Sequence, residues 1–129
     1  MVAYGQTWGS GLVINSFGDY QPVVLKNITA TNNYLHGIAM TSCGKTDLIN
    51  VMSLKNGSQA NEGHGLTIFN DFSSLITIRN SFFSYNSGNG IELKVANPYD
   101  TSLFKLYNVS YLGNDSNLNG SMDIEHFFS

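Results

Sequence analysis

Cysteine is nearly absent from this 129-residue chain, which has only Cys43 and therefore cannot form an internal disulfide. Arginine also occurs once, at Arg79, and the net charge of −3 comes without any run of basic residues. This charge distribution argues against nucleic acid or an anionic membrane as the main partner. No apolar run approaches the roughly 18 residues of a membrane-spanning helix, so the sequence predicts no membrane span.

Strong helix formers are scarce as well, because Ala, Glu, Lys and Arg are few and no stretch keeps a 3.6-residue period. The chain instead contains 13 Gly, 8 Phe and 7 Tyr, together with many Asn and Ser. This composition favours short strands joined by polar turns. The length suits one domain over residues 1–129, and the sequence predicts that this domain is all-β.

Two landmarks recur along the chain at intervals of about 25 to 30 residues. The first is a glycine before a short apolar strand, at Gly11, Gly37, Gly65, Gly90 and, with one extra residue, Gly120. The second is an Asn followed six residues later by another, as Asn27/Asn33, Asn50/Asn56, Asn80/Asn86 and Asn108/Asn114. Because both landmarks keep the same order, the chain consists of structural repeats.

Apolar and more polar residues alternate around these landmarks, which is the period of a β-strand. A weaker third strand follows the first Asn of each pair, and Met52 with Leu54 suggests a shifted register in the second coil. Three short strands per coil cannot bury their inner faces alone, so we expect about five coils stacked in parallel. Four residues should then form one inward file: Leu12, Ile38, Leu66 and Ile91.

The strand starts N-G-I and H-G-L, followed by x-I-x-I-x-N-x5-N, resemble the right-handed parallel β-helix of the pectin-lyase-like family. The resemblance extends from about Gly11 to Ile124. It implies a solenoid, whereas it leaves function open, because the family includes lyases, hydrolases, adhesins and structural shafts. The left-handed β-helix is disfavoured because its hexapeptide repeat is absent.

The first Asn of each pair has a physical reason to recur, because Asn tolerates the left-handed backbone of a tight corner. Its amide can also donate a hydrogen bond to the equivalent Asn one coil away. The sequence therefore predicts a structural ladder of Asn27, Asn50, Asn80 and Asn108.

Both ends of the repeat stop part-way through a coil, and the sequence shows no amphipathic capping helix. Uncapped ends offer unpaired strand edges. Two interpretations remain open: flanking coils of a longer chain cover the ends, or copies of this chain stack head to tail into a filament.

One catalytic motif is incomplete. In polygalacturonases of the resembled family, a G-H-G stands at a matching strand start, and carboxylates on neighbouring coils hydrolyse the glycosidic bond. Gly63-His64-Gly65 matches the triplet, but the carboxylate positions hold Leu35 and His36 in the preceding coil and Ser10 one coil earlier. We therefore interpret His64 as a strand-start residue, and the sequence predicts no complete catalytic site.

The outward face beside His64 forms a second candidate site. The repeat brings together Glu92, Lys94, Asp123 and Glu125 on neighbouring coils, with Asp123 beside Glu92 and Glu125 beside Lys94. Such a set would suit a sugar acid or a calcium ion. Arg79 falls on another sheet, so this face has no charge-stabilising arginine. The His and Cys residues have no metal-binding spacing, and we expect neither a metal nor another cofactor.

Five Asn-x-Ser/Thr sequons would carry glycans in a secretory eukaryote. We expect Asn56, Asn114 and Asn119 to be the better acceptors because they fall in turns, whereas ladder residues Asn27 and Asn108 should be partly buried. The sequence thus favours an extracellular or cell-surface structural β-helix, a shaft or self-stacking filament subunit that carries glycans. The alternative is a domain that binds or cleaves polysaccharide.

Overall fold

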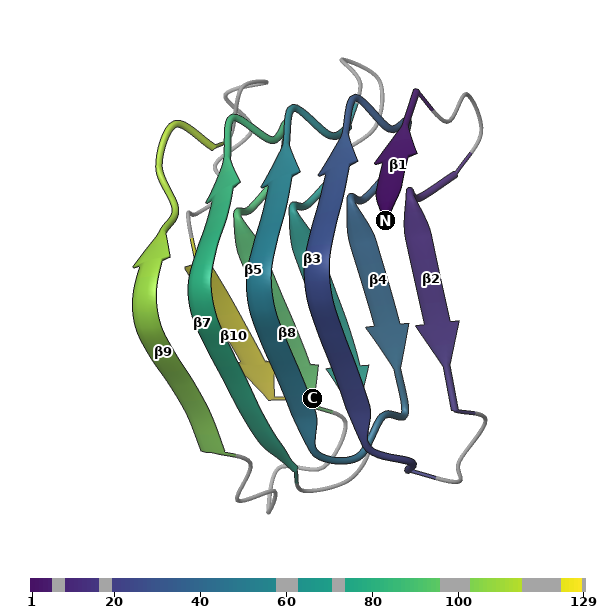
Figure 1. The fold of residues 1–129 in the computed structure, drawn as a ribbon, viewed down its shortest axis with the longest axis vertical. Coiled ribbons are helices and arrows are strands. Elements are labelled where there is room, and N and C mark those ends of the chain that lie inside the picture. Colours follow the sequence, from purple (N-terminus) through teal and green to yellow (C-terminus); the bar gives the residue numbers. More distant parts are fainter. Residues whose placement is uncertain are drawn as a thin grey trace.

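The computed structural model describes residues 1–5, 9–16, 20–57, 63–70, 74–95, 103–114 and 124–128. Every regular element within these ranges is a β-strand, and the strands form two parallel five-stranded sheets that face each other (Figure 1). The odd-strand sheet contains β1 (Val2–Tyr4), β3 (Val23–Thr31), β5 (Thr46–Leu54), β7 (Leu75–Ser84) and β9 (Leu103–Ser110). The even-strand sheet contains β2 (Leu12–Asn15), β4 (Ile38–Thr41), β6 (Leu66–Asn70), β8 (Ile91–Val95) and β10 (Ile124–Phe128).

Consecutive strands alternate between the two sheets, and every strand pairs in parallel with the strand one coil away. The chain is therefore a parallel β-solenoid, and the prediction of an all-β solenoid is confirmed. The solenoid makes about three turns, so the prediction of about five coils was wrong. Each sheet still contains five strands, one for each of the expected strand starts. No helix suited to crossing a membrane occurs in the described ranges.

The even-strand sheet has the predicted inward file. Leu12 pairs with Ile38, Ile38 with Leu66 and Leu66 with Ile91, and the last three are fully buried. These contacts between equivalent residues of successive coils form the hydrophobic core.

The final strand has a different register from the predicted one. Glu125 pairs with Glu92 and Phe127 with Lys94, whereas the sequence interpretation placed Asp123 and Glu125 there. The shift is two residues, and it brings Ile124 into register with Ile91 and the aliphatic file. Asp123 itself lies outside the described residues.

In the odd-strand sheet, the second and third strands expected in each coil are continuous and bend at the first Asn of each pair. Asn27, Asn50, Asn80 and Asn108 all have φ between 51° and 58°, the left-handed region. The second coil keeps the common register, because Val51 and Ser53 are buried while Met52 is 44% exposed. The shifted register suggested by Met52 and Leu54 was therefore wrong.

The two ends of the solenoid are less covered than its middle. Strands β1 and β2 lie at one end, and β9 and β10 at the other (Figure 1). Five hydrophobic residues of the end strands β2 and β9 pack against the core and are only partly buried: Leu12, Ile14, Phe104, Leu106 and Val109.

Candidate functional site

The strongest cluster of chemically active side chains lies where the even strands begin. His36, His64 and Asn89 each precede the glycine that opens β4, β6 or β8. The two imidazole rings are stacked, with centroids 5.0 Å apart and planes 9° apart. The His64 backbone N–H donates to His36 Nδ1 at 3.0 Å, and the Asn89 backbone N–H donates to His64 Nδ1 at 2.8 Å. Each imidazole therefore supplies a hydrogen-bond acceptor to the next coil.

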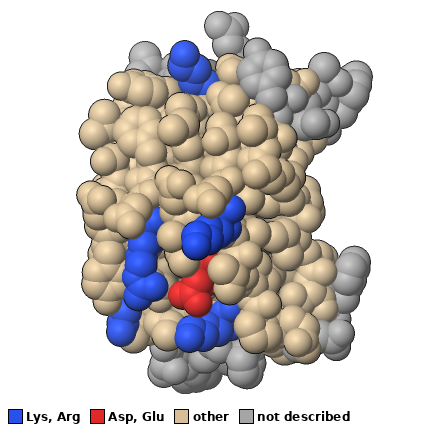
Figure 2. All heavy atoms as spheres, viewed as in Figure 1, with Lys and Arg blue, Asp and Glu red and all other residues tan. Residues whose placement is uncertain are grey.

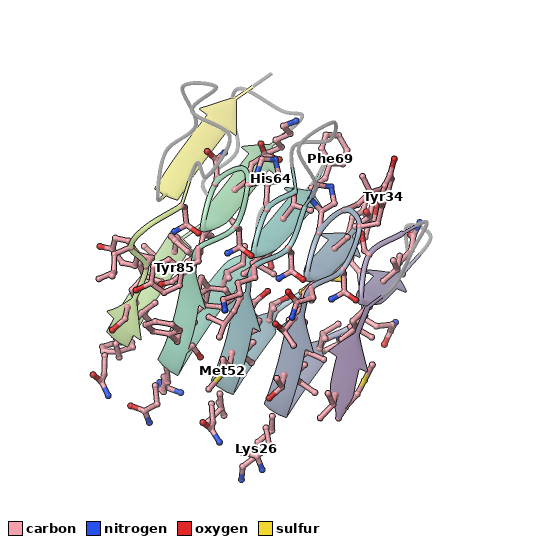
Figure 3. The ribbon with its side chains drawn as sticks, turned by 90° about the horizontal axis from the view of Figure 1, so that it is seen from above. Lys26, Tyr34, Met52, His64, Phe69 and Tyr85 are labelled. Carbon is pink, nitrogen blue, oxygen red and sulfur yellow. The ribbon has the colours of Figure 1, made fainter. Side chains whose placement is uncertain are left out.

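Glu92 on β8 lies beside His64 and is 6% exposed. His64 Nε2 is 3.0 Å from Glu92 Oε2, and Asn89 Nδ2 donates to the same oxygen at 3.4 Å. The Thr67 hydroxyl donates to Oε1 at 3.0 Å, and Lys94 Nζ is 3.6 Å from Oε1. Figure 3 shows His64 at this corner of the solenoid. Both carboxylate oxygens are thus held by neighbours.

These contacts fix the charge state of the carboxylate. Burial raises the pKa of Glu92, but the hydrogen bond and electrostatic interaction with His64 outweigh it. Together with the hydrogen bond from Thr67 and the charge of Lys94, they lower that pKa to about 2. Because His64 Nδ1 accepts the Asn89 N–H, the ring proton lies on Nε2 and points to Glu92. An ionised carboxylate cannot donate a proton at neutral pH, so Glu92 in this state is not a general acid.

The low pKa of Glu92 predicts a loss of stability in acid. Because the pKa of Glu92 is lower in the folded chain than its value of 4.5 in the unfolded chain, the ionised carboxylate stabilises the fold above pH 4.5. This contribution disappears as the pH falls toward 2. The contribution is about 2 to 3 kcal/mol. We expect Glu92→Gln to be less stable at pH 7 and to lose less stability between pH 4.5 and 2, as measured by urea denaturation at each pH. If the free energy of unfolding fell equally with pH in the variant and the parent, the low pKa of Glu92 would be contradicted.

The remaining members of the predicted face do not all reach this cluster. The structure brings together His64, Glu92 and Lys94, whereas Glu125 is placed only by its backbone register opposite Glu92. No group of three or more His, Cys, Asp or Glu residues in the described part of the chain could hold a metal ion. Cys43 is buried, with its Sγ 3.5 Å from the Thr41 carbonyl oxygen.

The predicted Asn ladder lies on the surface at the bends of the odd strands. Asn50 Nδ2 donates to Asn27 Oδ1 at 2.7 Å, and Asn108 Nδ2 donates to Asn80 Oδ1 at 2.9 Å. All four side chains are exposed. The left-handed backbone, rather than burial, is therefore the main reason that Asn recurs at this corner.

A second ladder, which the sequence interpretation missed, is buried at its first three members and half-buried at the fourth. It contains the second Asn of each pair: Asn33, Asn56, Asn86 and Asn114. The Oδ1 atom of each later Asn accepts the backbone N–H and the Nδ2 of the Asn one coil earlier, at distances between 2.9 and 3.1 Å. The signal was present in the sequence, because this Asn was the other half of the repeating landmark.

Burial reverses the expected order of the sequons. Asn56 was expected to be a good glycan acceptor because it falls in a turn, but it is 1% exposed and its Nδ2 donates to Asn86, Ser53 and Ala30, which removes the reason for that expectation. Asn114 is half-buried, and its Nδ2 donates to the Phe83 carbonyl. The expected partial burial of Asn27 and Asn108 was also wrong, because both are exposed. Asn119 lies outside the described residues.

The outer face of the odd-strand sheet carries most of the described positive charge. Figure 2 shows Lys and Arg spread over this face around a small acidic area. The exposed cations of the sheet and its borders are Lys26, Lys45, Lys55, Arg79 and Lys105, while Asp47 is half-buried among them. The Arg79 guanidinium lies 5.3 Å from the ring centroid of Tyr107, which is 49% exposed.

The fold and its side-chain ladders define a parallel β-solenoid. A scan of protein-family models gave no match, and searches of curated proteins and of solved structures found no similar protein. The residues and their contacts are therefore the basis of the functional proposal.

Proposed function

We propose that this chain is a structural solenoid of the right-handed, pectin-lyase-like kind, an extracellular shaft element that lengthens when further coils stack on its ends. Those coils come from a second copy of the chain or from flanking sequence. Parallel backbone pairing and stacked apolar files make such a rod stiff.

The observation that carries the proposal is the difference in burial between the middle and the ends. Ile38, Leu48 and Ile78 in the middle are fully buried, whereas Leu12 and Leu106 in the corresponding files at the ends are only partly buried. A further coil would cover these residues, and each Å² of apolar surface that it buries would contribute about 25 cal/mol of stability.

The exposed edge of β9 gives the proposal a specific surface. Leu103 and Leu112 are 52% and 53% exposed, and Tyr111 is 37% exposed. The outer edge of β9 has no strand partner within the described ranges. Unpaired parallel edges with apolar neighbours readily accept another strand.

End-to-end stacking can be tested by charging this end. We expect the parent chain to form rods in electron micrographs and to show a weight-average mass that rises with concentration. Leu103→Lys combined with Leu112→Lys should abolish the rods, because charged side chains oppose burial between coils. Met52→Lys is the matched control, because Met52 is 44% exposed and lies on β5, away from both ends of the solenoid. A parent chain that stays monomeric at every concentration would contradict self-stacking.

The glycosylation sequons support the proposed extracellular location. Asn27 and Asn108 belong to sequons and have exposed side chains, although Asn108 Nδ2 already donates to Asn80. Glycans at this corner would project from the side of the rod and leave its ends open.

Polysaccharide binding is the second candidate, and a specific contact favours it. Arg79 and Tyr107 form an exposed pair on the odd-strand sheet, where a ring can stack on a sugar and a guanidinium can bind a carboxylate. Retention of the parent chain on immobilised acidic polysaccharide, lost in Tyr107→Ala, would favour this function over the purely structural one.

A further inference from the structure

The two stacked histidines occupy a position where the chain also uses asparagine. In the third of these coils, Asn89 stands at the place taken by His36 and His64 in the coils before it. Both imidazoles face the following coil with Nδ1, which accepts a backbone N–H at 3.0 or 2.8 Å. An amide oxygen could serve as such an acceptor at any pH, whereas an imidazole nitrogen serves only while it is unprotonated.

We propose that His36 and His64 form a proton-sensitive clasp that holds three successive coils together at neutral pH and loosens their junctions in mild acid. Histidine is the side chain that ordinarily changes charge between about pH 5 and 8. A proton added at Nδ1 converts the acceptor into a donor that faces another donor, so the bond to the next coil is lost. Two imidazolium rings with centroids 5.0 Å apart also repel each other.

The charged groups beside His64 act on the ring edge opposite the lost bond. Glu92 on β8 lies 3.0 Å from His64 Nε2, and Lys94 lies 3.6 Å from the same carboxylate. Glu125 on β10 pairs in register with Glu92, while β4 and β6 contain no charged residue. The Glu92 carboxylate contacts Nε2, so it cannot replace the acceptor that Nδ1 gives to the Asn89 N–H. A proton at Nδ1 would therefore break the junction even with Glu92 in place.

Amide hydrogen exchange of the two donor groups tests the clasp directly. Between pH 7.5 and 5.0, after correction for intrinsic exchange, we expect protection of the His64 and Asn89 backbone N–H groups to fall at least tenfold. The Asn56 N–H, which donates to Asn86 Oδ1 at 3.0 Å, should keep its protection and serves as the internal reference.

The variant His36→Asn/His64→Asn keeps a hydrogen-bond acceptor at both positions but has no imidazole there to take up a proton. Protection of the two amides in this variant should change less than twofold over the same pH range. His126→Asn is the matched control, because it removes the third histidine, on β10, and should retain the parent response.

Constant protection in the parent, or an equal fall in the double variant, would overturn the proposal. If the double variant does not fold, His64→Asn alone should keep the Asn89 amide protected at pH 5.0. Nitrogen NMR shifts of the parent give an independent reading, because a protonated His64 Nδ1 at pH 7.5 would also overturn it.

Discussion

Replacing Asn56 by Leu should cost about 4 kcal/mol or more, a large part of the stability of a domain this size. Leu has the same branched skeleton with bulkier methyl groups, so crowding adds to a cost that comes mainly from lost hydrogen bonds. Asn56 Oδ1 accepts the backbone N–H of Asn33 at 3.1 Å and its Nδ2 at 2.9 Å, and both donors would lose their partner inside the fold. Each unsatisfied buried polar group costs about 1 to 3 kcal/mol, and the Ala30 carbonyl oxygen would also lose a donor.

The matched control is the same substitution in the exposed ladder. Asn80→Leu removes one surface hydrogen bond and forces Leu into a left-handed backbone with φ of 51°, which costs about 1 to 2 kcal/mol. Urea denaturation of both variants, followed by circular dichroism, measures the difference. Equal losses of stability in the two variants would contradict the distinction between a buried and an exposed ladder.

Gly63→Ala should destabilise the fold by about 3 kcal/mol or more, although alanine is only one methyl group larger. The added Cβ would overlap the Leu35 carbonyl oxygen and lie 2.6 Å from the Gly57 nitrogen. These are backbone atoms of neighbouring segments, so relief requires two coils to separate. That movement would also strain the bond that the Gly63 N–H donates to Ser87 Oγ at 2.9 Å.

Gly9→Ala is the control for this second experiment. No atom lies within 4 Å of a Cβ built at Gly9, so the variant should match the parent or gain a few tenths of a kcal/mol. Thermal and urea unfolding of both variants would measure the contrast. A Gly63→Ala variant as stable as the parent would show that the coils have room to adjust.

This packing also explains why the sequence contains a G-H-G triplet. A Cβ at Gly65 would lie 2.6 Å from the Gly90 carbonyl oxygen, so both glycines of the triplet are required by the close approach of neighbouring coils. His64 between them supplies an acceptor to Asn89. A short motif shared with hydrolases therefore has a structural reason in this chain.

The sequence predicted most of the fold because two kinds of local signal agree in every coil. The glycines mark strand starts, and the alternation around Ile76 and Ile78 determines which face is inward. The last strand could not be placed in the same way. The segment before Ile124 departs from the repeat, so alignment on Gly120 shifted the register by two residues.

The candidate site was less predictable because it depends on burial at a corner. Sequence spacing placed Glu92 and Lys94 on one face, and the structure brings Glu92 to His64 and Lys94 to Glu92. Spacing does not reveal that Glu92 is 6% exposed, nor which Asn of each pair turns into the interior. Asn50 and Asn56 are the same residue type six positions apart, and the backbone path around the bend makes the first exposed and the second buried.

The buried Asn ladder has a direction. Every amide in it donates toward the β9 end: Asn33 to Asn56, Asn56 to Asn86 and Asn86 to Asn114. In the surface ladder, donation runs the opposite way, from Asn50 to Asn27 and from Asn108 to Asn80. The two rows of amide dipoles therefore partly cancel, while the two ends of the molecule remain chemically unlike. Any assembly that continues these rows must be polar, with all subunits oriented the same way and growth possible at two non-equivalent tips.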